Sequence, residues 1–118
     1  MKKVPLWVDQ FAKPNNLTTS NTPNSEVDVL IVGSGYTGLC AARTLRQNGA
    51  SVVVLDRNTI GWGASSRNGG MATPGLKQDI QKIYKMYGSK LAHEFWDASV
   101  DAINLIDEIV KEHSIDCE

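Results

Sequence analysis

Apolar residues form two short, almost continuous runs in the first half of this chain. The first run, VDVLIV at positions 27–32, is aliphatic and β-branched, with Asp28 as its one polar exception. The second run, SVVVL at positions 51–55, has the same character. Such runs are typical of strands that are covered on both faces in a parallel sheet. We therefore predict two buried strands.

The segment between the two runs has helical spacing. Leu39, Ala42 and Leu45 recur on one face, and Asn48-Gly49 supplies a stop signal. A helix is therefore predicted over 37–48. Strand, helix and strand in this order form a βαβ unit, whose crossover is right-handed.

The second half of the chain is predicted to be mainly helical from Leu76 onward. An apolar stripe that includes Ile80 and Ile83 ends at Gly88, and Ser89 is placed to cap a second, longer helix. The apolar residues of that longer helix are Leu91, Phe95, Trp96, Ile103, Ile106, Ile109 and Val110. A third strand is expected to begin around Ile115.

Two regions are expected along the chain. Residues 1–26 form an N-terminal lead-in, in which 14–25 is rich in Asn, Thr, Ser and Pro and predicts turns. Residues 27–118 form the N-terminal part of a larger domain, because two strands and an unfinished third leave an open sheet edge. The alternative is a small domain completed by dimerisation, and the oligomeric state stays open.

Composition and charge narrow the classes of partner. The chain has 42% apolar and 21% charged residues and a formal net charge of −1. This is ordinary globular composition without a field that would attract nucleic acid or an anionic membrane surface, so small molecules are the expected partners. The sequence contains neither a signal-peptide core nor an apolar run long enough for a membrane span, and a cytoplasmic location is expected.

Cysteine and histidine spacing argues against a metal site. Cys40 and Cys117 lie far apart, which also argues against a disulfide framework, and both are expected to be plain thiols, buried or inert. His93 and His113 have no second ligand at a useful spacing. Surface or helix-end positions are expected for both histidines.

The motif GSGYTG at 33–38 follows the first strand and opens the predicted helix. Gly33 permits a tight turn, Gly35 lets the backbone approach a pyrophosphate, and Gly38 permits close packing of helix against strand. The helix N-terminus, with about half a positive charge, can then bind the diphosphate. We therefore predict a dinucleotide site in a Rossmann-like α/β domain with a parallel sheet, followed by helices.

Asp56 ends the second strand, where it can accept hydrogen bonds from the hydroxyls of the adenosine ribose. Arg57 follows it and has two interpretations. It could bind the 2′-phosphate of NADP, but Asp56 would repel that phosphate, and an exposed arginine is usually only solvated. The same architecture serves both NAD(P) and FAD, so the motif alone leaves the cofactor open.

A second motif resolves this choice through a family resemblance. The blocks VDVLIVGSGYTGLCAARTLRQNGASVVVLD and GWGASSRNGG resemble the D-amino-acid oxidase superfamily of flavoproteins, within it the gamma-glutamylputrescine oxidoreductase branch. The lead-in with Pro5-Leu6-Trp7 is similar to that branch as well. The resemblance implies an FAD-dependent oxidoreductase that oxidises an amine or amino acid by hydride transfer to the flavin. An NAD(P)-dependent dehydrogenase and a non-catalytic nucleotide-binding module are the alternatives.

The resemblance also implies that loop 61–70 runs along the cofactor toward the flavin ring. Three positions depart from what is common in the branch: Asp56 replaces Glu, Ser66 replaces Gly and Met71 replaces Gln. No His or Cys is placed for covalent attachment, so noncovalent FAD is expected. Trp62 either covers part of the cofactor or anchors the loop, and no catalytic residue is identified. The expected cofactor-binding residues are Gly33, Ser34, Gly35, Tyr36, Thr37, Gly38, Asp56, Arg57, Gly63, Ala64, Ser65, Ser66, Arg67, Asn68, Gly69, Gly70 and Met71.

Overall fold

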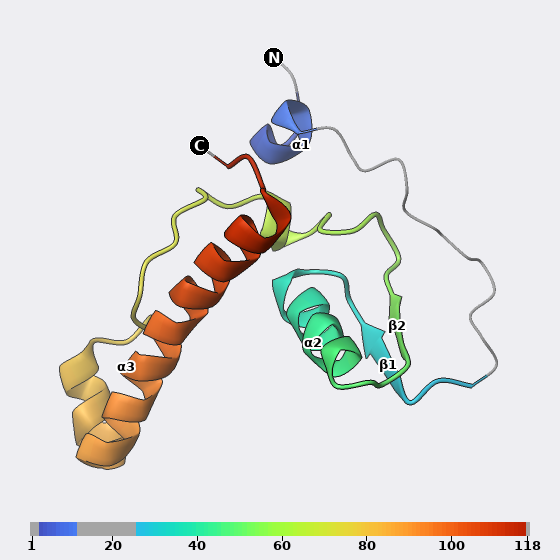
Figure 1. Cartoon of the computed structure of the whole chain (residues 1–118). Helices are drawn as coiled ribbons and strands as arrows, with labels where there is room; N and C mark the ends of the chain where they lie inside the picture. The colour runs from blue at the N-terminus through green and yellow to red at the C-terminus, as the bar shows by residue number, and fades with distance from the viewer. Residues whose placement is uncertain (1–2, 12–25, 118) are drawn as a thin grey trace. The chain divides into compact units, whose positions relative to one another are not determined.

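The computed structural model of the chain describes residues 3–11 and 26–117 (Figure 1). The turn-rich lead-in predicted over 14–25 lies outside the described residues. The chain divides into two compact units, Met1–Gly69 and Gly70–Glu118. The predicted boundary between a lead-in and a domain at residue 26 stays a prediction.

The first unit contains the predicted βαβ arrangement. Strand β1 (Val29–Val32) is followed by helix α2 (Tyr36–Gln47) and strand β2 (Val52–Leu55). The strands pair in parallel, with Val29 opposite Val52 and Val32 opposite Leu55. Helix α2 lies beside this two-stranded sheet in Figure 1. The α/β class and the crossover between parallel strands are thus confirmed.

Side-chain hydrogen bonds mark where the strands begin. The Ser51 amide and hydroxyl donate to Asp28 Oδ2 at 2.8 and 2.7 Å, and the Asp28 amide donates to Ser51 Oγ at 2.9 Å. These bonds lower the pKa of the Asp28 carboxyl, the bond from the Ser51 hydroxyl most of all. Residues 28 and 51 therefore form a side-chain clamp, and the regular strands start one residue later in each case.

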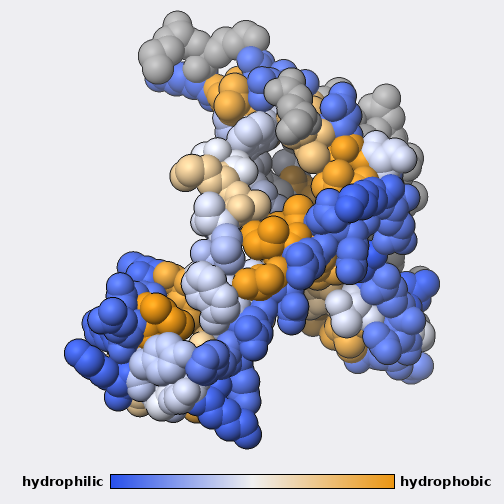
Figure 2. Space-filling model, turned by 60° about the vertical axis from the view of Figure 1, so that its left-hand side comes forward, coloured by the Kyte–Doolittle hydropathy of each residue, from blue (hydrophilic) through white to orange (hydrophobic). Residues whose placement is uncertain are grey.

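The sheet is covered on one face within the described residues. Val29 and Ile31 are half-buried, whereas Leu30 and Val32 are 54% and 83% exposed. The prediction of strands covered on both faces is therefore wrong for this structure, because α2 is the one helix packed on the sheet in the described part of the first unit. Figure 2 shows apolar side chains, in orange, open to solvent.

The second unit consists of an irregular segment and the long helix α3 (Ile80–His113). The helix begins later than the predicted Leu76, because the Asp79 carboxylate accepts a hydrogen bond from the Gln81 amide at 2.7 Å and caps it. Gly88 interrupts α3 with φ 79° and ψ 171°, which confirms the predicted break. Ile83 and Ala92 are buried on either side of it.

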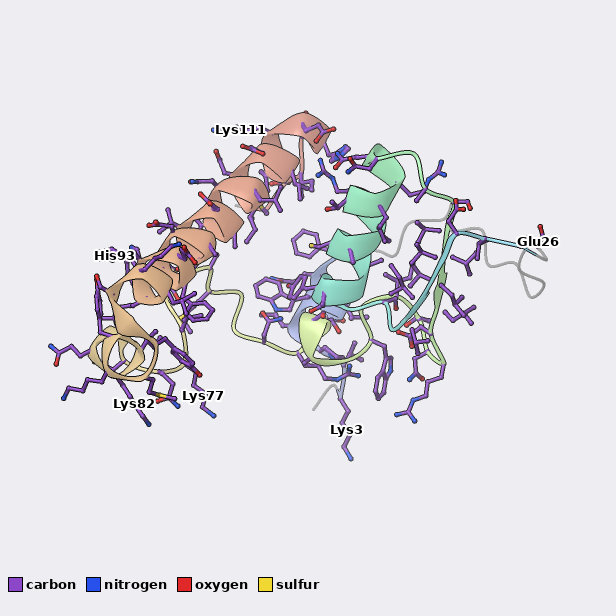
Figure 3. The ribbon with its side chains drawn as sticks, turned by 90° about the horizontal axis from the view of Figure 1, so that it is seen from below. Lys3, Glu26, Lys77, Lys82, His93 and Lys111 are labelled. Atoms are coloured by element: carbon purple, nitrogen blue, oxygen red, sulfur yellow. The ribbon has the colours of Figure 1, made fainter. Side chains whose placement is uncertain are left out.

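His93 bridges the break in α3 and is labelled in Figure 3. Its ring nitrogens lie 2.9 Å from the Tyr84 hydroxyl and 2.9 Å from the Ser89 carbonyl oxygen. Both His93 and His113 are exposed, as predicted. The predicted cap at Ser89 is wrong: its hydroxyl lies 3.4 Å from the His93 ring, and it bonds to no amide of the first helical turn in the described chain.

The predicted strand at Ile115 is also wrong. The Ile115 amide donates to the Val110 carbonyl at 3.0 Å, and Ser114 adopts a left-handed conformation, so these residues complete the end of α3. Cys40 and Cys117 are free thiols, and both are exposed, so neither is buried. A strand needs a partner, and residues 115–117 have none within the described ranges.

Candidate dinucleotide-binding site

The glycine turn after β1 has the geometry that its sequence requires. Gly33 adopts φ +105°, which side chains rarely tolerate, and its amide donates to the Leu55 carbonyl at 2.7 Å. A β-carbon at Gly38 would lie 2.0 Å from the Gly33 oxygen and 3.3 Å from Ile31 Cγ2. The first and third glycines thus bring α2 directly onto β1.

Gly35 begins helix α2 without a side-chain cap. Among the described residues, the Thr37 and Gly38 amides have no hydrogen-bond partner. The Tyr36 amide donates to Ser65 Oγ at 3.0 Å. The start of α2 therefore presents amide donors and the positive end of the helix dipole, the arrangement that binds phosphate groups in other proteins.

Asp56 lies beside this turn at the carboxyl end of β2. Its Oδ2 accepts hydrogen bonds from the Ser34 amide at 2.8 Å and the Ser34 hydroxyl at 2.7 Å, and its Oδ1 accepts one from the Asn58 amide at 2.9 Å. These bonds, with Asn58 the largest contributor, lower the pKa of Asp56 from 3.8 to about 2. The carboxylate is thus ionised at neutral pH.

The second motif folds back onto the glycine turn. The Gly61 amide donates to the Ser34 carbonyl at 3.0 Å, and a 3-10 turn (Ala64–Ser66) places Ser65 against the start of α2. A β-carbon on Gly35 would lie 2.9 Å from Ser65 Oγ. The structure therefore joins both motifs at one place. Gly61 was not among the expected contact residues, although its position at the start of the motif was the available signal.

Aromatic and polar contacts hold the rest of this loop. The Arg67 guanidinium lies 4.1 Å from the centre of the Trp62 ring and donates to the Gly63 carbonyl at 3.3 Å. The Asn68 side chain donates to the Ala64 carbonyl at 3.0 Å. Trp62 therefore contacts the loop through Arg67, and this contact supports the anchoring interpretation.

Helix α1 (Leu6–Gln10) contacts the same loop from the lead-in. Trp7 Nε1 donates to the Asn68 carbonyl at 2.9 Å. A cavity of about 410 Å³ lies here, and Ser66 lines it. The Ser66 hydroxyl is buried and has no partner among the described residues. Trp7 is a contact that the motifs alone did not predict.

Four expected contact residues, Arg57, Gly69, Gly70 and Met71, stay predictions. Arg57 is exposed beside Asp56 and acts on it through its charge alone. Gly69 ends the first unit, whereas Gly70 and Met71 belong to the second, and Met71 is 85% exposed. The contacts expected near the flavin ring stay predictions for these positions.

The residues of the first unit fit the ADP half of a dinucleotide. The fit rests on unpaired amides at the start of α2, a turn in which a β-carbon at Gly35 would meet Ser65, and an ionised carboxylate at the next strand end. Within the described ranges, no group of three or more His, Cys, Asp or Glu side chains is placed to hold a metal ion. No helix of residues 3–11 and 26–117 has the length and apolar character for crossing a membrane.

A parallel βαβ unit with a glycine turn and an acid at the second strand end defines a dinucleotide-binding domain of the Rossmann type. Residues 28–118 match the model of the DAO family of FAD-dependent oxidoreductases. The chain therefore belongs to that family, as the resemblance predicted.

Two relatives are similar over most of the chain. The probable oxidoreductase OrdL of Haemophilus influenzae is 38% identical over 97 residues, covering 82% of this chain and 22% of that protein. The gamma-glutamylputrescine oxidoreductase of Escherichia coli is 38% identical over 109 residues, covering 91% and 26%. The chain thus spans about a quarter of the length of these relatives. No solved structure matches it.

A third relative matches a shorter part of the chain. The thiamine thiazole synthase of Methanococcus maripaludis is 40% identical over 68 residues, 56% of this chain. The relatives of this chain thus carry different names, although each is similar to part of the same sequence. The fold alone therefore does not identify a substrate.

Proposed function

We propose that this chain binds the ADP half of noncovalently held FAD in an enzyme that oxidises an amine or amino acid. The family supports the cofactor, and the gamma-glutamylputrescine oxidoreductase relative supports an amine substrate. A cytoplasmic location remains part of the proposal, and cell fractionation tests it. No catalytic residue is assigned, and we expect this chain by itself to lack activity.

The observation that carries the proposal is the juxtaposition of three kinds of group: backbone amides, a hydroxyl and a carboxylate. The unpaired Thr37 and Gly38 amides open α2, the Ser65 hydroxyl lies over the same helix start, and the Asp56 carboxylate lies at the neighbouring strand end. Amides and a hydroxyl suit a diphosphate, whereas an ionised carboxylate suits ribose hydroxyls. A nicotinamide dinucleotide would use the same groups, so the experiment compares both cofactors.

The protein's contribution to the reaction is binding and orientation. Bound FAD supplies the capacity to accept a hydride from the carbon next to the substrate nitrogen. The start of α2 would fix the diphosphate, and loop 61–69 would direct the cofactor from that point. Ser65 connects these two elements through its bond to the Tyr36 amide.

Titration of the purified chain with FAD and with NAD⁺ tests the proposal. We expect binding of FAD, with flavin absorbance retained after desalting, and no comparable binding of NAD⁺. Gly35→Val should weaken FAD binding by at least about tenfold, because the added side chain enters the space next to Ser65 Oγ.

The matched control is Ala41→Val, which adds comparable bulk to an exposed position of the same helix. This variant should bind FAD like the parent chain. Equal affinity of the parent and Gly35→Val for FAD would contradict the assigned position of the diphosphate. Preference for NAD⁺ over FAD would favour the dehydrogenase alternative.

A further inference from the structure

Helix α1 contacts loop 61–69 through the side chain of Trp7. This side chain is half-buried, whereas Leu6, Val8 and Phe11 of the same segment are exposed. The Trp7 Nε1 donates to the Asn68 carbonyl oxygen at 2.9 Å, across 61 positions of sequence. A helix of five residues is too short to be stable by itself. The position of α1 therefore depends on its contact with the loop.

The residue that Trp7 binds is itself bonded to the 3-10 turn. The Asn68 side-chain nitrogen donates to the Ala64 and Ser65 carbonyls, both at 3.0 Å. Ser65 Oγ in turn accepts from the amide of Tyr36, the first residue of α2, at 3.0 Å. Successive hydrogen bonds therefore join Trp7 to the helix start at which the diphosphate is proposed to bind.

Packing beside the Trp7 hydrogen bond is incomplete. Leu6 and Trp7 on α1, and Ser66 and Arg67 on the loop, line the same cavity of about 410 Å³. Side chains that face each other across a cavity lose the van der Waals contacts of a packed interior. The directional bond from the indole N–H thus accounts for a larger share of what holds the loop to α1.

We propose that Trp7 is a positioning residue of the cofactor site, which holds loop 61–69 against the start of α2 through Asn68 and Ser65. This inference deepens the proposed function and rests on it. A loop that is ordered before the cofactor arrives loses less conformational entropy on binding, which lowers the Kd. Because coupling between two sites is reciprocal, bound FAD should also hold the Trp7 indole more firmly against Asn68.

Hydrogen exchange of the ligand-free chain tests the connection between Trp7 and α2. Trp7→Phe keeps an aromatic ring and removes the indole N–H. The Tyr36 amide should exchange at least about threefold faster in this variant, because its acceptor Ser65 is held less firmly. The Val29 amide, which donates to the Ser51 carbonyl at the amino ends of the strands, should keep its rate. A general loss of stability would instead speed the exchange of both amides.

Titration with FAD tests the consequence for the cofactor. Trp7→Phe should bind FAD about three- to tenfold more weakly than the parent chain, which corresponds to the loss of one neutral hydrogen bond. The matched control is Phe11→Leu, which shortens an exposed aromatic side chain at the end of the same helix. This control should bind FAD like the parent. In the parent, saturation with FAD should slow the exchange of the Trp7 indole N–H.

The outcomes separate the two proposals. Equal FAD affinity of the parent and Trp7→Phe would overturn the positioning role and leave the proposed function in place. An unchanged Tyr36 amide in Trp7→Phe would overturn the connection through Ser65. Failure of the parent to bind FAD would overturn the proposed function and the cofactor role of Trp7 together. Should Trp7→Phe not fold, the parent decides, because a Trp7 indole N–H that exchanges equally fast with and without FAD would overturn the inference.

Discussion

At the scale of single residues, two aspartates at opposite ends of one pair of strands each accept hydrogen bonds from a serine. Ser51 clamps Asp28 before the strands begin, and Ser34 clamps Asp56 after they end. In both pairs the hydroxyl and amide of one serine converge on one carboxylate oxygen, which favours the charged form. The pKa of each aspartate is accordingly lowered.

The lowered pKa of Asp56 predicts how stability depends on pH. Asp56 has a pKa of about 2 in the folded chain against an ordinary value of 3.8, so its contribution is complete above about pH 4 and is lost as the pH falls toward about 2. Asn58 and Ser34 provide the hydrogen bonds, and Arg57 is the neighbouring charge. Asp56→Asn removes this contribution.

Thermal melts of the parent chain and Asp56→Asn between pH 7 and pH 2 measure the effect. The parent should be the more stable above about pH 4, and the difference between the two proteins should shrink below it. Asp28→Ala serves as the control, because it shows how much of the loss of stability in acid comes from the other clamped aspartate of the first unit. A difference that is constant over the whole range would contradict the link between the Asp56 charge and folding.

Residue-level sequence reasoning identified the turn but not its hydrogen bonds. The motif predicted that Gly33 and Gly38 make a tight turn and a close contact, and the structure shows both. It placed Ser34 with the cofactor contacts, and it did not show that the Ser34 hydroxyl donates to Asp56. The cofactor contacts themselves stay predictions.

At the scale of elements, local patterns predicted the helix and strands to within one or two residues. The apolar runs gave β1 and β2, and the periodicity between them gave α2. The errors lie where the outcome depends on distant partners or on one side-chain bond. Asp79 delays the start of α3, and Ile115 bonds back to the helix.

Gly88 provides a test at this scale. Its φ of 79° and ψ of 171° belong to a region that is essentially restricted to glycine. Gly88→Ala should therefore lower the free energy of unfolding by about 1–3 kcal/mol, measured by denaturant unfolding. Lys90→Ala, at an exposed position just after the break, should change it by less than about 0.5 kcal/mol. Increased stability of Gly88→Ala would show that the break is dispensable.

At the scale of the whole molecule, the family was predictable because two separate motifs and their spacing all lie in the chain. The second motif ends at Gly70, the first residue of the second unit, so the two motifs carry no information about the rest of that unit. Apolar side chains such as Leu30 and Val32 remain exposed on the sheet. Surfaces of this kind promote association, so binding experiments belong at low protein concentration.

Arg67 stacks on Trp62, and the fluorescence of this tryptophan can report on loop 61–69. The Trp62 indole ring lies 4.1 Å from the Arg67 guanidinium, and a flavin bound nearby would accept its excitation energy. Arrival of the yellow coenzyme along this loop would dim the tryptophan emission, and occupancy could be followed without attaching any dye.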